Sequence, residues 1–248
     1  GRGGGRGRGG RGARGERPRN IRVRAMRSET DARYRDAVRA RRAAVHGKSR
    51  GRVGYLHLPD MERFGLAEVW RNVALESARG GLVVDLRSNA GGCGSELLLA
   101  RLQQRLLGFD LPRWGAPERF PAAAVSGPVA VLVDESTGSD GEVAAHAFRQ
   151  LGLGTVFGRR TWGGVAANLR GASLVDGSEV AMPEAACHLE GVGFGLENKG
   201  VVPDVEVAAA PQDYAKGRDP QLEAAVEHTL RLLEAKPPAE PPAVPGGG

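Results

Sequence analysis

The chain has 248 residues, of which 41% are hydrophobic, so it is long and apolar enough for one domain with a buried core and short appendages. No apolar stretch approaches the roughly 20 residues that span a bilayer, so a membrane protein is not expected. The net charge of +6 is unevenly divided, because residues 1–52 hold 18 basic and 4 acidic residues whereas the remainder holds 17 basic and 25 acidic residues.

The first 20 residues, GRGGGRGRGGRGARGERPRN, are a low-complexity segment. They include no apolar residue beyond Ala13, so we predict that they are disordered. Arg-Gly tracts can bind RNA, but this one lacks the aromatic residues on which bases stack. Because the rest of the chain is acidic, nucleic-acid binding is not favoured, and a passive linker is the preferred interpretation. The segment has no apolar core of a secretory signal.

From residue 21 onward the pattern predicts a folded protein. A connector over 21–52 is expected to hold an extended segment and a helix at 28–46. Further strands are predicted at 53–58, 81–87, 128–135 and 155–160, a β-hairpin at 165–183, and helices at 65–78, 95–108, 141–152 and 220–235. Strands separated by helices predict stacked βα units with a mostly parallel sheet. We therefore expect one α/β core over 53–236 and a disordered Pro/Gly-rich tail over 237–248.

Two turns that follow predicted buried strands contain residues suited to catalysis. DLRSNAGG (85–92) ends one strand in a glycine-rich turn, where backbone N–H groups can approach a ligand. The spacing fits neither a dinucleotide fingerprint nor a P-loop, and a purely structural turn would explain the same glycines. STGSDG (136–141) repeats the arrangement after the next long strand and places Ser139 at the start of a helix.

Ser139 has two interpretations. Local sequence alone favours a helix N-cap, with Glu142 three residues later completing a capping box. The presence of two such turns favours a nucleophile, because a parallel sheet would bring both turns to one edge. There the N–H groups of Gly92 and Asp140 could surround one carbonyl oxygen. The pair of turns therefore predicts acyl transfer at Ser139, with the cap as the alternative.

A serine nucleophile needs a base, and the sequence offers no obvious one. His146 is two helical turns from Ser139 and out of hydrogen-bond reach. His57, in a predicted strand, stays a candidate, although a half-buried, hydrogen-bonded histidine is the commoner outcome there. Surface roles are expected for His46, His188 and His228.

Only two cysteines occur, Cys93 and Cys187, so a disulfide framework is not expected and a reducing, cytoplasmic setting is. The His and Cys residues show no metal-ligand spacing, so we expect neither a metal nor an organic cofactor.

Six segments resemble, in order, the C-terminal catalytic region of the tricorn branch of the tail-specific, carboxyl-terminal processing serine peptidases. They are GRVGYLHLPDM, GLVVDLRSNAGG, STGSDGE, LGLGTVFGRRTWGG, GFGLENKGVVPDVEV and PQDYAKGRDPQLEAAVE. The resemblance extends from about residue 21 to about residue 235. It implies the ClpP/crotonase-like α/β core of these peptidases, peptide substrates and a homo-oligomeric complete protein.

The resemblance also implies roles for individual residues. Ser139 matches the nucleophile, and the N–H groups of Gly92 and Asp140 match the oxyanion hole. Glu197 matches the glutamate that, with an upstream serine, orients the catalytic histidine. Asp110 matches an acidic residue associated with preference for a basic side chain on the acyl side of the cleaved bond.

One departure from the family pattern concerns the base. In this branch the catalytic histidine lies upstream of a PDZ module, whereas this chain begins after that position and does not start with Met. TWGG (161–164) stands where lysine-dyad relatives carry their base, which agrees with a histidine-dependent branch. We therefore expect a serine endopeptidase catalytic region that is a fragment without its base. The alternatives are an inactive peptide-binding or scaffold protein with this fold, and an RNA-associated protein.

Overall fold

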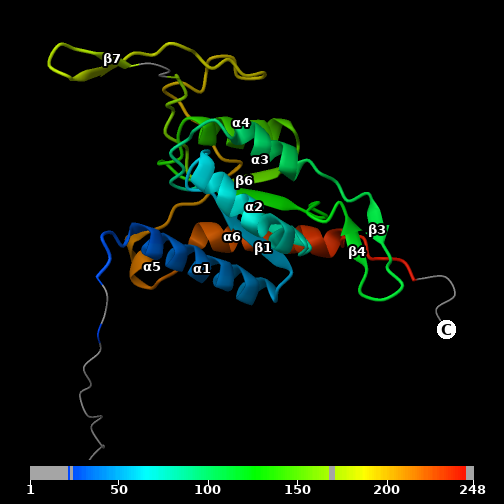
Figure 1. The fold of residues 1–248 in the computed structure, drawn as a ribbon. Coiled ribbons are helices and arrows are strands. Elements are labelled where there is room, and N and C mark those ends of the chain that lie inside the picture. Colours follow the sequence, from blue (N-terminus) through cyan, green and yellow to red (C-terminus); the bar gives the residue numbers. More distant parts are fainter. Residues whose placement is uncertain (1–21, 23–24, 168–170, 244–248) are drawn as a thin grey trace, which may run out of the picture.

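The computed structural model describes residues 22, 25–167 and 171–243 (Figure 1). The predicted disordered segment 1–20 and residues 244–248 of the predicted tail lie outside the described residues. So do residues 21, 23 and 24 of the predicted extended segment. None of the helices in the described part is both long enough and apolar enough to cross a membrane.

A five-stranded parallel sheet, ordered β1-β2-β5-β6-β9, forms the centre of the fold. Its strands are β1 (Val53–His57), β2 (Gly81–Asp85), β5 (Val129–Val133), β6 (Gly154–Gly158) and β9 (Val205–Glu206). Every residue of β1, β2 and β5 is buried, because helices cover both faces, and this explains the continuous apolar runs in their sequences. The predicted parallel α/β fold is confirmed.

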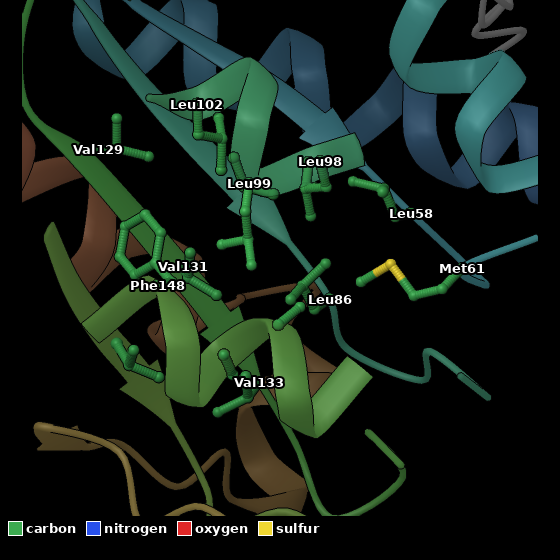
Figure 2. Packing of buried hydrophobic residues seen from close by; sticks show 14 of the residues in the cluster. Leu58, Met61, Leu86, Leu98, Leu99, Leu102, Val129, Val131, Val133 and Phe148 are labelled. Carbon is green, nitrogen blue, oxygen red and sulfur yellow. The ribbon is translucent and has the colours of Figure 1, made fainter. Parts of the chain in front are cut away.

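Helices α1 (Thr30–Ser49) and α6 (Pro220–Ala235) pack together on one face of the sheet. Helices α2 (Arg63–Ser77), α3 (Ser95–Leu102) and α4 (Asp140–Gln150) cover the other (Figure 1). Figure 2 shows how leucines of α3 and Phe148 of α4 lie against the valines of β5. These two apolar layers hold the sheet, and the turns at its carboxyl edge, in place.

The remaining elements are short. They are the antiparallel pair β3 (Gly108–Asp110) and β4 (Glu118–Phe120), the hairpin β7 (Gly171–Ser173) and β8 (Glu179–Ala181), and helix α5 (Pro211–Ala215). The predicted hairpin is present and stands away from the sheet (Figure 1). The prediction of a helix to residue 108 was wrong: α3 ends at Leu102, the last residue of the run that packs in the core, and Leu107 is exposed.

A buried ion pair closes the carboxyl edge of the sheet on the side of α1 and α6. Arg87 donates to both carboxylate oxygens of Asp85, at 2.9 and 2.7 Å, and to Asp219 at 2.8 Å. Tyr55 donates its hydroxyl to Asp85 at 2.8 Å. Burial alone would raise the pKa of Asp85, but the Arg87 guanidinium outweighs it and holds this pKa at about 2.

This pair predicts a loss of stability in acid. Because the pKa of Asp85 is lower in the folded chain than its ordinary 3.8, its stabilisation is present above about pH 4 and is lost as the pH falls towards 2. The contribution should be about 2 kcal/mol. Urea unfolding between pH 2 and 6 should therefore show a weaker acid dependence for Asp85→Asn than for the natural chain.

The matched control for this measurement is Asp36→Asn, since Asp36 is exposed and, among the described residues, pairs only with Arg39 one helical turn away. It should leave the acid dependence unchanged. Equal pH slopes for Asp85→Asn and the natural chain would contradict the assignment.

Candidate active site

Ser139 connects β5 to α4 through a strained backbone. Its φ of 52° and ψ of −125° lie where residues other than glycine are rare, at a cost on the order of 1–3 kcal/mol. Its N–H donates to the carbonyl of Gly164 at 3.0 Å and to Glu142 Oε2 at 3.1 Å. Ser139 occupies the N-cap position of α4 and shares the predicted capping box with Glu142, but its hydroxyl donates no hydrogen bond to any described residue. The hydroxyl is therefore available for other chemistry.

The glycine-rich turn after β2 lies directly against Ser139. A Cβ atom placed on Gly91 would be 2.5 Å from the Ser139 Cβ and 3.0 Å from its Oγ. Asn89 joins the two turns, because its side chain accepts the N–H of Gly91 at 2.8 Å and its carbonyl accepts the N–H of Gly138 at 2.9 Å. The two turns singled out in the sequence thus meet at one edge of the sheet.

Two backbone N–H groups have no acceptor among the described residues: that of Asp140, which follows Ser139, and that of Gly92, which follows Gly91 in the turn that contacts Ser139. The Asp140 side chain is occupied, since its carboxylate accepts the N–H of Ser95 at 2.8 Å and so ties the start of α4 to the start of α3. The Asp140 N–H also lies at the positive end of the α4 dipole. Two open donors beside a serine hydroxyl match the arrangement that stabilises a developing oxyanion.

The buried side chain of Glu142 connects the segments around Ser139 through hydrogen bonds. Its carboxylate is fully buried and accepts hydrogen bonds from the Thr161 hydroxyl, from Gly163 N–H at 2.7 Å, from Gly164 N–H at 2.9 Å and from Ser139 N–H. A carboxylate at the third position of a helix is further stabilised by the helix dipole. The sequence indicated only the link to Ser139. The donors from 161–164 could not be predicted, because they come from another segment of the chain.

Glu197 lies beside the same loop. Its Oε2 accepts the N–H groups of Val165 at 2.9 Å and Ala166 at 2.8 Å. Its second carboxylate oxygen has no partner within the part of the chain that the structure describes. Since Val165 follows Gly164, whose carbonyl accepts the Ser139 N–H, Glu197 is linked to Ser139 through the 164–166 segment.

Asp110 is not brought to Ser139 within one chain. It is exposed on β3, and Arg119 of the paired strand β4 donates to the carbonyl of Ser77, just before the amino end of β2. Ser139 follows the carboxyl end of β5, so Asp110 lies at the opposite end of the sheet. Its role in specificity stays a prediction.

The histidines are engaged elsewhere. His57 is buried on the sheet face covered by α1, and its Nδ1 lies 3.2 Å from the Tyr34 hydroxyl, whereas Ser139 begins a helix on the other face. Burial lowers the pKa of His57. The other four contact Glu76 (His46), the Glu190 carbonyl (His146), the Phe194 ring (His188) and Thr155 (His228). Across the described residues, no three His, Cys, Asp or Glu side chains gather as a metal site.

Comparisons with known proteins match this geometry to a family. Residues 52–207 match the family described as Peptidase family S41. The chain is 48% identical over 217 residues to Tricorn protease homolog 1 of Streptomyces coelicolor, which covers 88% of this chain and 20% of that protein. It is 40% identical over 215 residues to Tricorn protease of Thermoplasma acidophilum, covering 87% of this chain and 20% of that protein.

A solved structure shows the same similarity to tricorn proteases. The crystal structure of the tricorn protease superposes with a TM-score of 0.86 at 39% sequence identity, covering 89% of this chain and 22% of that one. The chain thus spans about a fifth of the length of these relatives.

Gly91 provides a first test of the site. In Gly91→Ala the new methyl group would collide with Ser139, and the positive φ of 89° adds strain. Gly177→Ala is a matched control, because Gly177 also has a positive φ, of 82°, but no atom lies within 4 Å of the added carbon. Urea unfolding should show a loss at least about 1 kcal/mol larger for Gly91→Ala than for Gly177→Ala. Equal losses would mean that the two turns are not in contact.

Glu142 provides a second test. In Glu142→Gln an amide NH2 replaces one of the two acceptor oxygens and faces N–H donors, so we expect the free energy of unfolding to fall by roughly 1–3 kcal/mol. Glu227→Gln, an exposed change on α6, should alter it by less than about 0.5 kcal/mol. Similar values for the two variants in urea unfolding would argue against the buried carboxylate cluster.

Proposed function

Because this chain belongs to peptidase family S41, we propose that it carries the nucleophile half of a serine-peptidase active site and acts on peptides through an acyl-enzyme at Ser139. The observation that supports this most strongly is the contact of the Gly91 turn with Ser139, which brings the turn that carries the open N–H of Gly92 against the serine and against the open N–H of Asp140. A helix cap alone would need neither the strained backbone nor those donors.

The proposed reaction is acyl transfer. The Ser139 oxygen attacks the peptide carbonyl carbon while its proton passes to a base, and the carbonyl oxygen becomes an oxyanion that accepts hydrogen bonds from Gly92 and Asp140 N–H. The carbon–nitrogen bond then breaks, and the leaving amine takes the proton from the base. Water attacks the resulting ester in the same way and releases Ser139.

The base in this proposal comes from outside the 248 residues of the sequence, because none of the five histidines forms a hydrogen bond with Ser139 in the described structure. The second carboxylate oxygen of Glu197, which has no partner among the described residues, would orient an incoming histidine directly or through a hydroxyl group.

We further propose that the peptide substrates carry a basic residue and that the complete protein is a homo-oligomer. Asp110 lies at the other end of the sheet from Ser139 in the same chain. An interaction of Asp110 with a peptide bound at Ser139 would therefore have to come from another copy, which links the specificity proposal to the oligomer.

The test is labelling of the intact chain with a fluorophosphonate at pH 7 and 9, with and without imidazole as an external base. Mass spectrometry identifies the labelled serine. Ser139 should react on the order of 10²-fold faster than the exposed Ser136, because oxyanion donors accelerate acyl and phosphoryl capture even without a resident base. Imidazole should raise the Ser139 rate, and Ser139→Ala should abolish this label.

Equal labelling of Ser139 and Ser136 in a folded chain would contradict the proposal. That result would favour a non-catalytic peptide-binding protein that keeps the fold.

A further inference from the structure

Trp162 is a large apolar side chain that is exposed on a rigid loop. The residue as a whole is 69% accessible to solvent. Its own N–H donates to the Thr137 carbonyl at 3.0 Å, and its neighbours Thr161 and Gly163 are bound to the buried carboxylate of Glu142. The loop that carries the indole is therefore fixed from both sides.

The indole ring lies against two glycines, Gly138 and Gly164, which we call its seat. A Cβ atom on Gly138 would lie 2.8 Å from the Trp162 ring, and one on Gly164 would lie 2.5 Å from it. Neither glycine has a positive φ, so the backbone conformation itself does not require glycine at these positions. The space that the indole occupies accounts for both.

The seat places the indole next to the nucleophile. Gly138 precedes Ser139 in the chain, and the carbonyl of Gly164 accepts the Ser139 N–H at 3.0 Å. An aromatic side chain that is already ordered, yet still exposed, loses little conformational entropy when it binds a partner. Nothing in the local fold needs this apolar surface to face solvent beside Ser139.

The position of the indole indicates which part of a peptide it meets. The Asp140 N–H lies against the Gly91 turn, whereas Trp162 belongs to the 161–166 loop, to which Glu197 is hydrogen-bonded through Val165 and Ala166. The leaving amine must be protonated by the base, which the proposed function places near Glu197. The leaving-group half of the peptide therefore faces the 161–166 loop.

We propose that Trp162 forms an apolar wall for the side chain that follows the cleaved bond, so that the site favours a large apolar or aromatic residue at that position. This inference rests on the proposed function for its orientation, but binding to the indole itself does not require turnover. It makes Trp162 a specificity-determining residue that contacts the substrate beside Ser139.

L-Phenylalanine amide and glycine amide mimic leaving groups with and without such a side chain. Saturation-transfer NMR on the intact chain should detect phenylalanine amide at millimolar concentration and give at least about tenfold weaker binding for glycine amide. Trp162→Ala should remove this preference, and Trp162→Phe should restore most of it. Trp114→Ala is the matched control, because Trp114 is 86% exposed on the loop between β3 and β4, at the other end of the sheet from Ser139.

Gly138→Ala tests the seat itself, since it keeps the tryptophan but displaces the ring. It should weaken phenylalanine amide binding by several-fold, with thermal unfolding confirming that the variant is folded. Unchanged binding in Trp162→Ala, or equal binding of the two amides, would overturn the inference. Fluorophosphonate labelling reports separately on Ser139. A reactive Ser139 with no Trp162-dependent binding defeats only this inference, whereas an inert Ser139 defeats the proposed function and leaves only an amide-binding surface at Trp162.

Discussion

The site depends on the hydrogen bonds that the buried carboxylate of Glu142 accepts. This carboxylate accepts hydrogen bonds from Thr161, Gly163, Gly164 and Ser139, and in this way joins the start of α4 to a loop 20 residues later in the chain. The strained backbone at Ser139 costs on the order of 1–3 kcal/mol. Hydrogen bonds to a charged group contribute about 1.5–3 kcal/mol each, so the cluster exceeds that cost. A buried carboxylate without its donors would instead be strongly destabilising.

The sheet supplies the second constraint, because parallel strands end at one edge and bring their following turns together. β2 and β5 are neighbours, so the Gly91 turn and Ser139 meet there, and Asn89 joins them. The same topology separates other groups from the site. His57 faces the α1 layer, and Asp110 lies at the amino end of the sheet. In the proposed function the chain thus presents Ser139 as the nucleophile with Gly92 and Asp140 as oxyanion donors, and the base approaches from outside.

The sequence allowed prediction of the sheet, because buried strands and amphipathic helices leave strong periodic patterns. It also placed Ser139 and Gly92 at the correct edge, since turns after parallel strands meet there. It missed β3 and β4, because three-residue strands carry no periodic pattern. It could not place Glu142 or Trp162, whose environments depend on contacts between distant segments. A glutamate three residues after a serine reads as an exposed capping residue, and only its burial shows the larger role.

Amide hydrogen exchange, followed by NMR on the intact chain, shows whether the buried Glu142 carboxylate holds the turn at Ser139 while the N–H groups of Gly92 and Asp140 stay open. We expect slow exchange, retarded on the order of 10³-fold or more, for the bonded N–H groups of Ser139, Gly163 and Gly164, and fast exchange for Gly92 and Asp140. Fast exchange at the first three, in a chain whose β5 amides are protected, would contradict this expectation.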